Sequence, residues 1–355
     1  MRIALNVDFP LRMATGVSRF GMELARAIAA TGHLAEAWLN RASREWAPEF
    51  RAMGATVRFY PFPRRLTDRF WPSAMARRNG IDAVLSPGGV MPASTGGAAH
   101  AVILHDMGPF ILEDMKTDAD TRAWRSRIHD AVRRASRILV NSVVTRRDLI
   151  GIYPNAEGRT VLVPPGIDHF HGEGRSGKML HILAVGTLEP RKNYETLLEA
   201  YSILRASHPG MPPLVIAGMD GYRAERIRRL PSGLGLGSSV SFTGYVSEER
   251  LRELYRDAAC LVHPALYEGF GFTVAEAFAW RLPVACSSAG ALGEFFTGCA
   301  HMFDPLDAVG MSDAIATCLD SGVTPGQQGN RARLAADLTW ESAAHRTIEA
   351  LEEAL

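Results

Sequence analysis

The chain has 355 residues, of which 47% are hydrophobic and 22% are charged, a composition typical of a soluble globular protein. This length predicts two domains. No apolar run approaches the roughly 18 residues that a membrane-spanning helix needs, and residues 1–8 lack the long apolar segment and cleavage site of a signal peptide.

The formal net charge of +1 is divided unevenly along the chain. Residues 1–175 contain 24 Lys and Arg against 17 Asp and Glu, whereas the remainder contains 15 against 21. Arginine-rich helices are usually solvated surfaces, but a basic half also suits an acidic partner or an anionic membrane surface. No nucleic-acid-binding motif accompanies the charge, so nucleic acid is not expected as a partner.

The first half alternates between predicted strands and helices. Residues 2–7 predict a strand, and a turn at residues 15–19 leads into a helix that continues to about residue 30. Further strands are expected at residues 57–60, 83–86, 99–105, 137–141 and 160–163. A long arginine-rich helix is expected at about residues 119–135, and Ser142 is the predicted cap of the next helix. Residues 168–178 are polar and glycine-rich, and they predict a linker.

The alternation restarts after this segment. Strands are predicted at residues 181–185, 214–217, 240–243, 260–264 and 284–287. Helices are predicted at residues 194–206, 247–258, 275–280, 307–319, 326–337 and 340–355. The pattern favours two doubly wound, Rossmann-like α/β domains that face each other across a cleft. We expect a first domain at residues 1–170, a second domain at 171–339 and a helix at 340–355 that packs back on the first domain.

The four cysteines all lie in the second half, and none shows C-x-x-C spacing. Cys260 and Cys286 fall in predicted apolar strands. We therefore expect reduced thiols in the core of a cytoplasmic protein, in preference to disulfides or a zinc site.

A glycine-rich turn at residues 267–273 follows the predicted strand at 260–264 and precedes a helix. Such a turn lies at the carboxyl end of a strand, where open α/β sheets bind ligands, and a helix N-terminus attracts anions. The glycines at 269 and 271 allow close approach of a ligand to the backbone. Glu268 and Glu276 bracket this turn. The alternative for Glu276 is a capping box with Thr273, and the turn alone does not decide between capping and ligand binding.

A second polar constellation follows the predicted strand at 181–185. Gly186 permits a sharp exit from the strand, and Pro190 precedes the adjacent cations Arg191 and Lys192. Positive charge at a helix N-terminus opposes the helix dipole, so an anionic ligand explains these cations better than a solvated pair does. A diphosphate group between this turn and the glycine-rich turn is the ligand that satisfies both constellations.

Residues 186–193 and 268–276 resemble the paired signatures of the retaining nucleotide-sugar glycosyltransferases of family 4, which have the GT-B fold. The resemblance covers nearly the whole chain, including residues 16–19, 104–106, 141–142, 165–168 and 242–246. The Glu-Pro-Arg-Lys-Asn form at 189–193 is most similar to the bacterial mannosyltransferases that build surface polysaccharides. Many relatives have arginine directly after the strand glycine, where this chain has Thr187, and Arg191 is expected to supply that charge.

The resemblance implies that the domain at 1–170 lies on the acceptor side and that the domain at 171–339 binds the nucleotide sugar. It also implies roles for individual residues. Arg191 and Lys192 would stabilise the departing nucleoside diphosphate, and Glu268 and His105 would contact the transferred sugar. Glu276 would bind the ribose hydroxyls, and Val246 would meet the base through its backbone. Gly16 would allow close approach of the donor phosphates or the acceptor. The remaining expected donor-binding residues are Gly186, Gly269, Phe270, Gly271, Phe272 and Thr273.

The expected reaction is transfer of a sugar, with mannose from GDP-mannose as the best match, to a hydroxyl group of a glycan or lipid-linked acceptor. We expect a front-face mechanism without a metal or other cofactor. Asp118 and Asp120 match a metal-binding D-x-D pattern superficially, but they lie at a predicted helix start, where acidic residues suit the dipole. The location expected is the cytoplasm, at the inner face of the membrane if the acceptor is lipid-linked. The alternatives are a nucleotide-sugar epimerase, a phosphorylase or a non-catalytic sugar-binding subunit.

Overall fold

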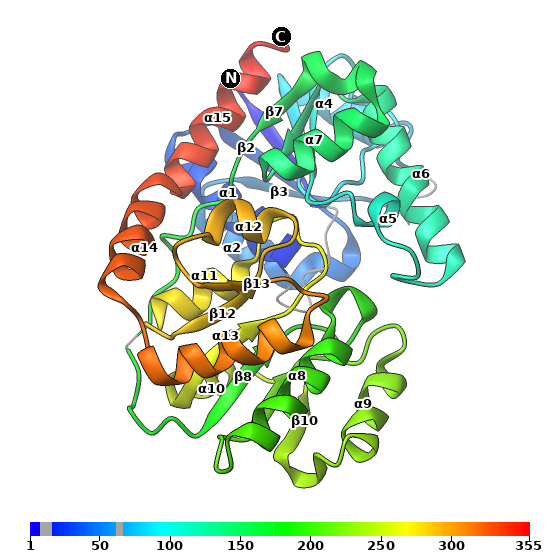
Figure 1. Ribbon diagram of the computed structural model, residues 1–355. Helices are drawn as coiled ribbons and strands as arrows, with labels where there is room; N and C mark the ends of the chain where they lie inside the picture. Colours follow the sequence, from blue (N-terminus) through cyan, green and yellow to red (C-terminus); the bar gives the residue numbers. More distant parts are fainter. Residues whose placement is uncertain (8–15, 62–66, 173) are drawn as a thin grey trace. The chain divides into compact units, whose positions relative to one another are not determined.

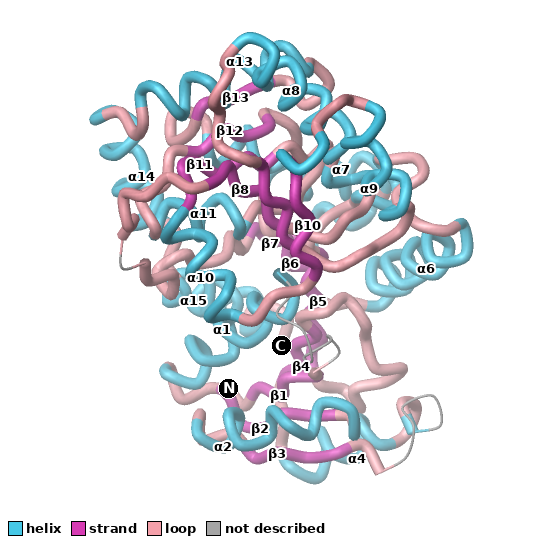
Figure 2. The backbone as a smooth tube through the Cα atoms, turned by 90° about the horizontal axis from the view of Figure 1, so that it is seen from below, coloured by secondary structure: helices cyan, strands magenta, loops and turns pink. Residues whose placement is uncertain are grey.

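The computed structural model describes residues 1–7, 16–61, 67–172 and 174–355 (Figures 1 and 2). Two compact units divide the chain. Unit 1 consists of Met1–Met107, Arg122–Gly166 and Leu338–Leu355, and unit 2 consists of Gly108–Thr121 and Ile167–Asp337. Each unit is a parallel sheet with helices, so the expected α/β class with two Rossmann-like domains is confirmed.

The sheet of unit 1 has seven parallel strands in the order β3-β2-β1-β4-β5-β6-β7. Almost every residue of β1, β4, β5 and β6 is buried, as expected for parallel strands that helices cover on both faces. The strands are β1 (Ile3–Asn6), β2 (Leu34–Leu39), β3 (Thr56–Phe59), β4 (Ala83–Ser86), β5 (Ala99–Leu104), β6 (Arg137–Val140) and β7 (Thr160–Leu162).

The helices of unit 1 connect these strands in the right order for a doubly wound fold. Ser142 caps α7 by accepting a hydrogen bond from the backbone N–H of Thr145 at 3.0 Å, as predicted. The helices are α1 (Gly16–Ala30), α2 (Ala47–Ala52), α4 (Trp71–Asn79), α6 (Asp118–Arg134, of which Asp118–Thr121 belong to unit 2), α7 (Val143–Ile152) and α15 (Trp340–Glu352), with 3-10 turns η1 (Arg41–Trp46) and η2 (Pro154–Arg159).

Helix α15, drawn in red in Figure 1, belongs to unit 1 although it follows the whole of unit 2 in sequence. It packs against α1, where the rings of Phe20 and Trp340 meet edge to face with centroids 5.3 Å apart. The guanidinium of Arg137 donates to the carbonyl oxygen of Glu353 at 2.9 Å. These contacts tie the last helix to the first helix and to β6.

The sheet of unit 2 has six parallel strands in the order β10-β9-β8-β11-β12-β13. The sequence pattern identified five of these strands within one or two residues. The strands are β8 (His181–Val185), β9 (Leu214–Ala217), β10 (Val240–Gly244), β11 (Ala258–His263), β12 (Val284–Ser287) and β13 (His301–Phe303).

Helices α8 and α13 pack side by side and bury their apolar faces in the core of unit 2 (Figure 1). Burying one leucine contributes roughly 1.5–3 kcal/mol, so this face supplies much of the stability of the unit. The helical elements are α5 (Gly108–Ile111), η3 (Pro190–Lys192), α8 (Tyr194–Ser207), α9 (Ala224–Gly233), η4 (Gly237–Ser239), α10 (Glu248–Asp257), α11 (Phe272–Ala279), α12 (Ala291–Phe296), α13 (Ala308–Ser321) and α14 (Pro325–Asp337).

Two further sequence expectations concern cysteines and membrane spans. All four cysteines are buried free thiols, as predicted. Among the described residues, no helix combines the length and the apolar character that crossing a bilayer requires.

Residues 108–121 leave unit 1 after β5 and join unit 2. The hydroxyl of Tyr222 donates to Oδ1 of Asp114 at 3.0 Å, and Arg223 forms an ion pair with the same carboxylate. Lys116 Nζ lies 3.9 Å from Glu189 Oε2. This excursion was not predicted, because the sequence of the segment carries no signal of the partners that it meets.

Strand β2 was also missed by the sequence analysis. Glu36 interrupts the apolar run of this strand, yet its side chain is buried. The carboxylate accepts hydrogen bonds from Trp38 Nε1 and Arg58 Nε, both at 2.7 Å. The polar residue is compatible with the core because both of its oxygens are paired, a fact that composition does not reveal.

The segment at 168–178, predicted as a linker, has no helix or strand in its described residues. It is nevertheless packed against unit 2. The backbone N–H of Ser176 donates to the carbonyl of Arg256 at 2.9 Å. A Cβ at Gly172 would lie 2.5 Å from the carbonyl oxygen of Ala279, so only glycine fits there.

Candidate active site

The site of unit 2 lies at the point where the order of the strands reverses in its parallel sheet. β8 is flanked by β9 on one side and β11 on the other, so the connections from β8 and β11 diverge. Ligands of open α/β sheets bind outside the carboxyl ends of the strands at such a point. The turn at 186–193 follows β8 and the turn at 264–271 follows β11, so both predicted constellations lie at this position.

The turn after β8 has a tightly specified backbone. Gly186 adopts φ +150°, and the hydroxyl of Tyr194 donates to its carbonyl oxygen at 3.0 Å. Pro190 begins the 3-10 turn η3, which ends at Asn193 in the left-handed region with φ +57°. The buried Asn193 side chain donates to the carbonyl oxygens of Pro264 at 3.1 Å and Pro305 at 2.7 Å. Asn193 thereby joins the two turns.

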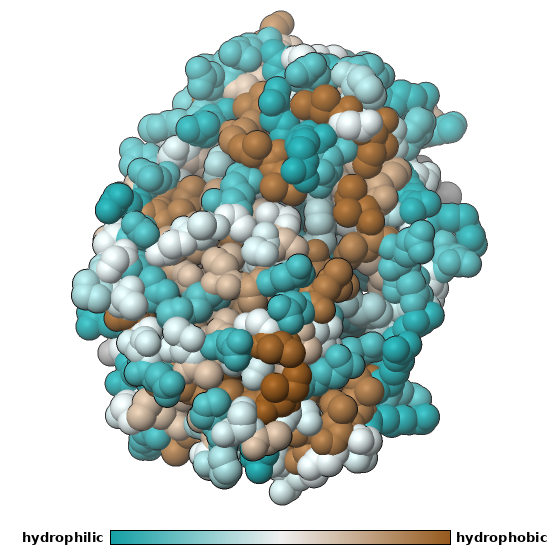
Figure 3. Space-filling model, viewed as in Figure 1, coloured by the Kyte–Doolittle hydropathy of each residue, from teal (hydrophilic) through white to brown (hydrophobic). Residues whose placement is uncertain are grey.

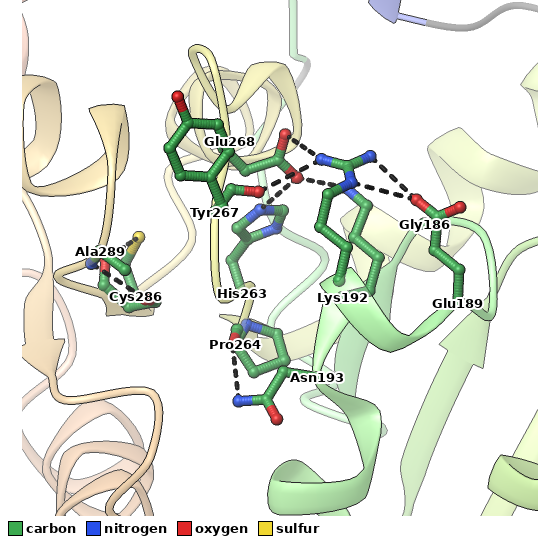
Figure 4. A network of polar contacts seen from close by, with 12 residues as sticks. Gly186, Glu189, Lys192, Asn193, His263, Pro264, Tyr267, Glu268, Cys286 and Ala289 are labelled. Atoms are coloured by element: carbon green, nitrogen blue, oxygen red, sulfur yellow. Dashed lines mark hydrogen bonds and ion pairs between the residues drawn. The ribbon is translucent and has the colours of Figure 1, made fainter. Parts of the chain in front are cut away.

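Arg191 and Lys192 converge on the carboxylate of Glu268, which Figure 4 labels together with Lys192. Arg191 Nη1 donates to Glu268 Oε2 at 2.8 Å, and Lys192 Nζ donates to Glu268 Oε1 at 2.5 Å. All three side chains are largely buried, with exposed fractions of 12–16%. The structure therefore brings together three of the four residues expected to be catalytic.

The carboxylate of Glu268 is ionised. Burial alone would raise its pKa, but the charges of Arg191 and Lys192, together with His263, outweigh burial and hold the pKa of Glu268 well below its usual range. A carboxylate stabilised by two cations is a weak nucleophile.

His263, the last residue of β11, was not singled out from the sequence. Its imidazole is 2% exposed, and Nε2 lies 3.5 Å from Glu268 Oε1, too far for a good hydrogen bond. Burial lowers the pKa of His263 and outweighs the attraction of Glu268, so the ring is neutral. A histidine in an apolar strand carries no sequence signal that separates a site residue from a core residue.

Glu189 was likewise missed as a site residue. Its side chain is 9% exposed, and Oε1 accepts from Arg191 Nη2 at 2.9 Å and from Nε at 3.2 Å. Arg191 thus lies between two carboxylates, with Glu189 at one end of the network and Glu268 at the other (Figure 4). Its adjacency to Arg191 in the Glu-Pro-Arg-Lys-Asn stretch was the available signal.

The glycine-rich turn differs from one sequence interpretation. Helix α11 begins at Phe272, with Gly271 at its N-cap in the positive-φ region at +112° and no side-chain cap. Thr273 therefore lies inside the helix, and the capping box with Glu276 is wrong. Glu276 Oε2 instead accepts a hydrogen bond from the hydroxyl of Tyr255 at 2.7 Å.

The other expected donor-binding residues of unit 2 lie on the same loops or next to them. Gly269 and Phe270 are buried in the turn, and Phe270 packs edge to face against Phe272 with centroids 5.1 Å apart. Phe272 and Thr273 are half-buried at the start of α11. Val246 follows β10 and is half-buried one residue before the N-cap of α10.

Gly16 and His105 belong to unit 1. Gly16 is exposed and is the first residue of α1, and the preceding Thr15 lies outside the described residues. His105 follows β5, with Nε2 2.7 Å from the carbonyl oxygen of Pro87 and Nδ1 3.1 Å from the side-chain nitrogen of Asn141. Both ring nitrogens are engaged within the unit, so the imidazole in this conformation offers no unused nitrogen to a sugar.

No group of three or more His, Cys, Asp or Glu side chains within the described ranges is arranged to hold a metal ion. Asp118 and Asp120 lie in the first turn of α6, as expected from the sequence. Thr117 donates its hydroxyl proton to Asp120 Oδ2 at 2.7 Å and accepts from the Asp120 backbone N–H at 3.2 Å. The Thr117 hydroxyl therefore caps the N-terminus of α6, and the Asp120 carboxylate is bonded to that hydroxyl.

Two family models match adjacent parts of the chain. The model described as "Glycosyltransferase Family 4" matches residues 14–169, and the model described as "Glycosyl transferases group 1" matches residues 168–334. The join between them lies close to the point at which the chain passes from unit 1 to unit 2.

Two curated relatives have similar sequences. An O-antigen chain mannosyltransferase B of Escherichia coli is 26% identical over 259 residues, which are 69% of this chain and 68% of the relative. A D-inositol 3-phosphate glycosyltransferase of Acidothermus cellulolyticus is 30% identical over 181 residues, which are 46% of this chain and 40% of the relative.

A solved structure shares the fold. The protein Alr3699/HepE of Anabaena, in complex with UDP and glucose, superposes with a TM-score of 0.77 at 15% identity, over 99% of this chain and 100% of that one. At this identity the likeness concerns the fold.

Proposed function

Because the chain belongs to the glycosyltransferases of group 1 and family 4, we propose that it is a retaining mannosyltransferase that uses GDP-mannose. The proposed acceptor is a hydroxyl group of a glycan or lipid-linked glycan, in the synthesis of a surface polysaccharide. The observation that carries the proposal is the convergence of Arg191 and Lys192 at the switch point of the unit 2 sheet. The choice of mannose is supported by the O-antigen mannosyltransferase among the relatives.

The two cations suit a reaction in which a nucleoside diphosphate departs. When the bond between the anomeric carbon and the β-phosphate oxygen breaks, negative charge grows on the diphosphate. Arg191 has paired donors that match phosphate oxygens, and Lys192 adds a compact charge beside them. Preorganised charges of this kind act in a partly desolvated site without reorganising during the reaction.

We propose front-face attack for the transfer. The acceptor hydroxyl attacks the anomeric carbon from the side on which the nucleotide leaves, and a phosphate oxygen takes the hydroxyl proton. A double displacement would need Glu268 to form a covalent bond to the sugar. A carboxylate that keeps even one of these cations beside it is a poor nucleophile, and this supports the front-face route.

The proposed location is the cytoplasmic face of the membrane. Helix α6 exposes Arg122, Arg125, Arg127 and Arg133, and hydrophilic residues cover this helix at the right of Figure 3. Cationic side chains at a protein surface attract anionic lipid headgroups. A lipid-linked acceptor would be reached from such a surface.

One experiment tests the proposed reaction. The protein is incubated with a panel of GDP and UDP sugars, and nucleotide release is measured with and without glycan acceptors. Acceptor-dependent release from GDP-mannose supports the proposal, as does a product with the α configuration of the donor. Interconversion of the nucleotide sugars would indicate an epimerase, phosphate-dependent release would indicate a phosphorylase, and binding without turnover would indicate a non-catalytic subunit.

A further inference from the structure

Arg191 is held by a carboxylate on each edge of its guanidinium, and the two carboxylates have different surroundings. Nη1 donates to Glu268, and the Nε and Nη2 edge donates to Glu189. We propose that Glu189 is a positioning residue that keeps Arg191 in place. Glu268, in contrast, pairs with the two cations only until the donor diphosphate binds them and displaces it. The inference rests on the proposed function, because it assigns a diphosphate to this site.

Glu268 occupies the point at which both proposed phosphate-binding cations meet. Its two oxygens accept from Arg191 and Lys192 separately, so one carboxylate satisfies both side chains at the end where they converge. A diphosphate that binds the same two cations competes for the same donor hydrogens. Binding of the donor therefore requires Glu268 to give up at least one of these contacts, which frees a carboxylate oxygen for a sugar hydroxyl.

Glu189 contacts the opposite edge of the guanidinium. It lies on the same turn as Arg191, where its carbonyl oxygen accepts from the backbone N–H of Lys192 at 3.0 Å and so closes the turn. Its second carboxylate oxygen is 3.9 Å from Lys116 Nζ, in the segment 108–121. Glu189 therefore stays with Arg191 when Glu268 is displaced, and it leaves the Nη1 end of the guanidinium directed at the ligand.

The charges of the network fit this division of roles. Arg191, Lys192 and Lys116 carry three positive charges against the two negative charges of Glu189 and Glu268. Both glutamates are negative and close to the expected diphosphate. Simple electrostatics therefore predicts that neutralising either one tightens the binding of an anion. A positioning role for Glu189 predicts the opposite sign for that residue alone.

The test is the affinity of GDP and UDP, measured by calorimetry, for Glu189→Ala, Glu268→Ala and the wild-type chain. Glu268→Ala should bind the diphosphate severalfold more tightly, since a competing anion has gone. Glu189→Ala should bind it about tenfold more weakly, because losing a hydrogen bond to a charged group costs about 1.5 kcal/mol or more. Glu225→Ala removes an exposed carboxylate of the same unit, 89% exposed in its side chain, and should leave the affinity unchanged.

Glu189→Gln keeps an acceptor atom for Arg191 while removing the charge, and it is the variant to use if Glu189→Ala does not fold. If Glu189 positions Arg191, the Glu189→Gln variant should bind GDP and UDP more tightly than the Glu189→Ala variant does. Equal tightening of both Glu189 variants would overturn the proposal, as would weaker binding in Glu268→Ala. If the wild-type chain binds neither nucleotide, the proposed function itself fails, and this outcome is distinct from a wrong sign in the variants.

Discussion

The imidazole of His105 donates a hydrogen bond from Nε2 to the carbonyl oxygen of Pro87 at 2.7 Å. A carbonyl oxygen only accepts, so Nε2 carries the proton, and the unprotonated Nδ1 accepts from Asn141 at 3.1 Å. These two hydrogen bonds therefore fix the ring as the neutral tautomer that is protonated at Nε2. Its hydrogen bond holds the turn that follows β4, at the switch point of the unit 1 sheet.

The first prediction follows from the neutral histidines His105 and His263. Burial lowers the pKa of both rings, in His105 against the opposing effects of Pro87 and Asp106. Below about pH 6.5 the unfolded chain takes up protons that the folded chain does not, so the free energy of unfolding falls as the pH falls. Each ring contributes a slope of up to roughly 1.4 kcal/mol per pH unit in this window.

Urea denaturation between pH 7.5 and 5.5 measures this slope. His105→Gln retains hydrogen-bonding capacity without titrating, so its stability should depend less on pH than that of the wild type. His33→Gln, which replaces a half-buried histidine immediately before β2, is the matched control. Identical slopes in His105→Gln and the wild type would show that the ring titrates in the folded state as it does in the unfolded state.

The second prediction concerns the two cations. Arg191→Ala and Lys192→Ala should each lower kcat by about a hundredfold or more, as removal of one charge-stabilising donor does in other enzymes. Arg229→Ala, at a site 83% exposed in the same unit, should retain full activity. Melting temperatures without ligand establish that the variants fold. Near-normal turnover in a folded Arg191→Ala or Lys192→Ala would contradict the diphosphate assignment.

The third prediction concerns Glu276. Because Gly271 caps α11, a ligand role for Glu276 predicts that Glu276→Gln weakens GDP binding about tenfold while stability changes little. Thr273→Val should not lower the melting temperature appreciably, since its hydroxyl does not cap the helix. Tyr255→Phe removes the hydrogen bond to Glu276 and keeps the carboxylate. Unchanged GDP affinity in Glu276→Gln would contradict the ligand role and show that Glu276 serves only to accept the hydrogen bond from Tyr255.

The fourth prediction concerns metal ions. The proposed mechanism assigns the stabilisation of the leaving diphosphate to Arg191 and Lys192, so transfer should persist in excess EDTA. Activity is measured after dialysis against the chelator, with Mg²⁺ or Mn²⁺ added back to a parallel sample. Loss of transfer with EDTA and recovery with either ion would refute the metal-free mechanism.

The fifth prediction concerns membrane binding by α6. Replacing Arg122, Arg125 and Arg127 with alanine should lower the affinity for anionic vesicles about a hundredfold at low salt, because each arginine near the surface contributes roughly 1 kcal/mol. Vesicle sedimentation measures this affinity. The matched control replaces the exposed Arg229, Arg250 and Arg252 of unit 2. Binding that is indifferent to anionic lipid or to salt would show that the α6 arginines are only a solvated surface.

Much of the fold was predictable because parallel strands are buried on both faces and appear as apolar runs. The bounds of β4, β8, β9 and β12 agree with the predicted ranges. Strand β2 was missed because the buried Glu36 interrupts its apolar run, and the ion-pair partner Arg58 lies 22 residues away in the sequence. Helix α9 was missed because Pro231 lies inside it and only the tertiary contacts of Ile227 show its buried side.

The site was predictable where a local turn carries the chemistry. The positions of Arg191, Lys192 and Glu268 follow from strand ends and glycine-rich turns, whose geometry depends on residues close in sequence. Glu189 was identifiable only by its adjacency to Arg191, whereas Asn193 acts through contacts with the distant Pro264 and Pro305. The residue types of His263 and Asn193 are common in cores and at surfaces, so the folded chain is needed to identify them as neighbours of the charged cluster.

The return of α15 to unit 1 has a consequence for synthesis on the ribosome. Phe20 finds its partner Trp340 only after the residues of unit 2, up to Asp337, have been translated. Unit 2 can complete its core while α1 still lacks the helix that covers it. The first unit to begin is therefore the last to finish, and the part of α1 that α15 covers stays uncovered until Trp340 has been synthesised.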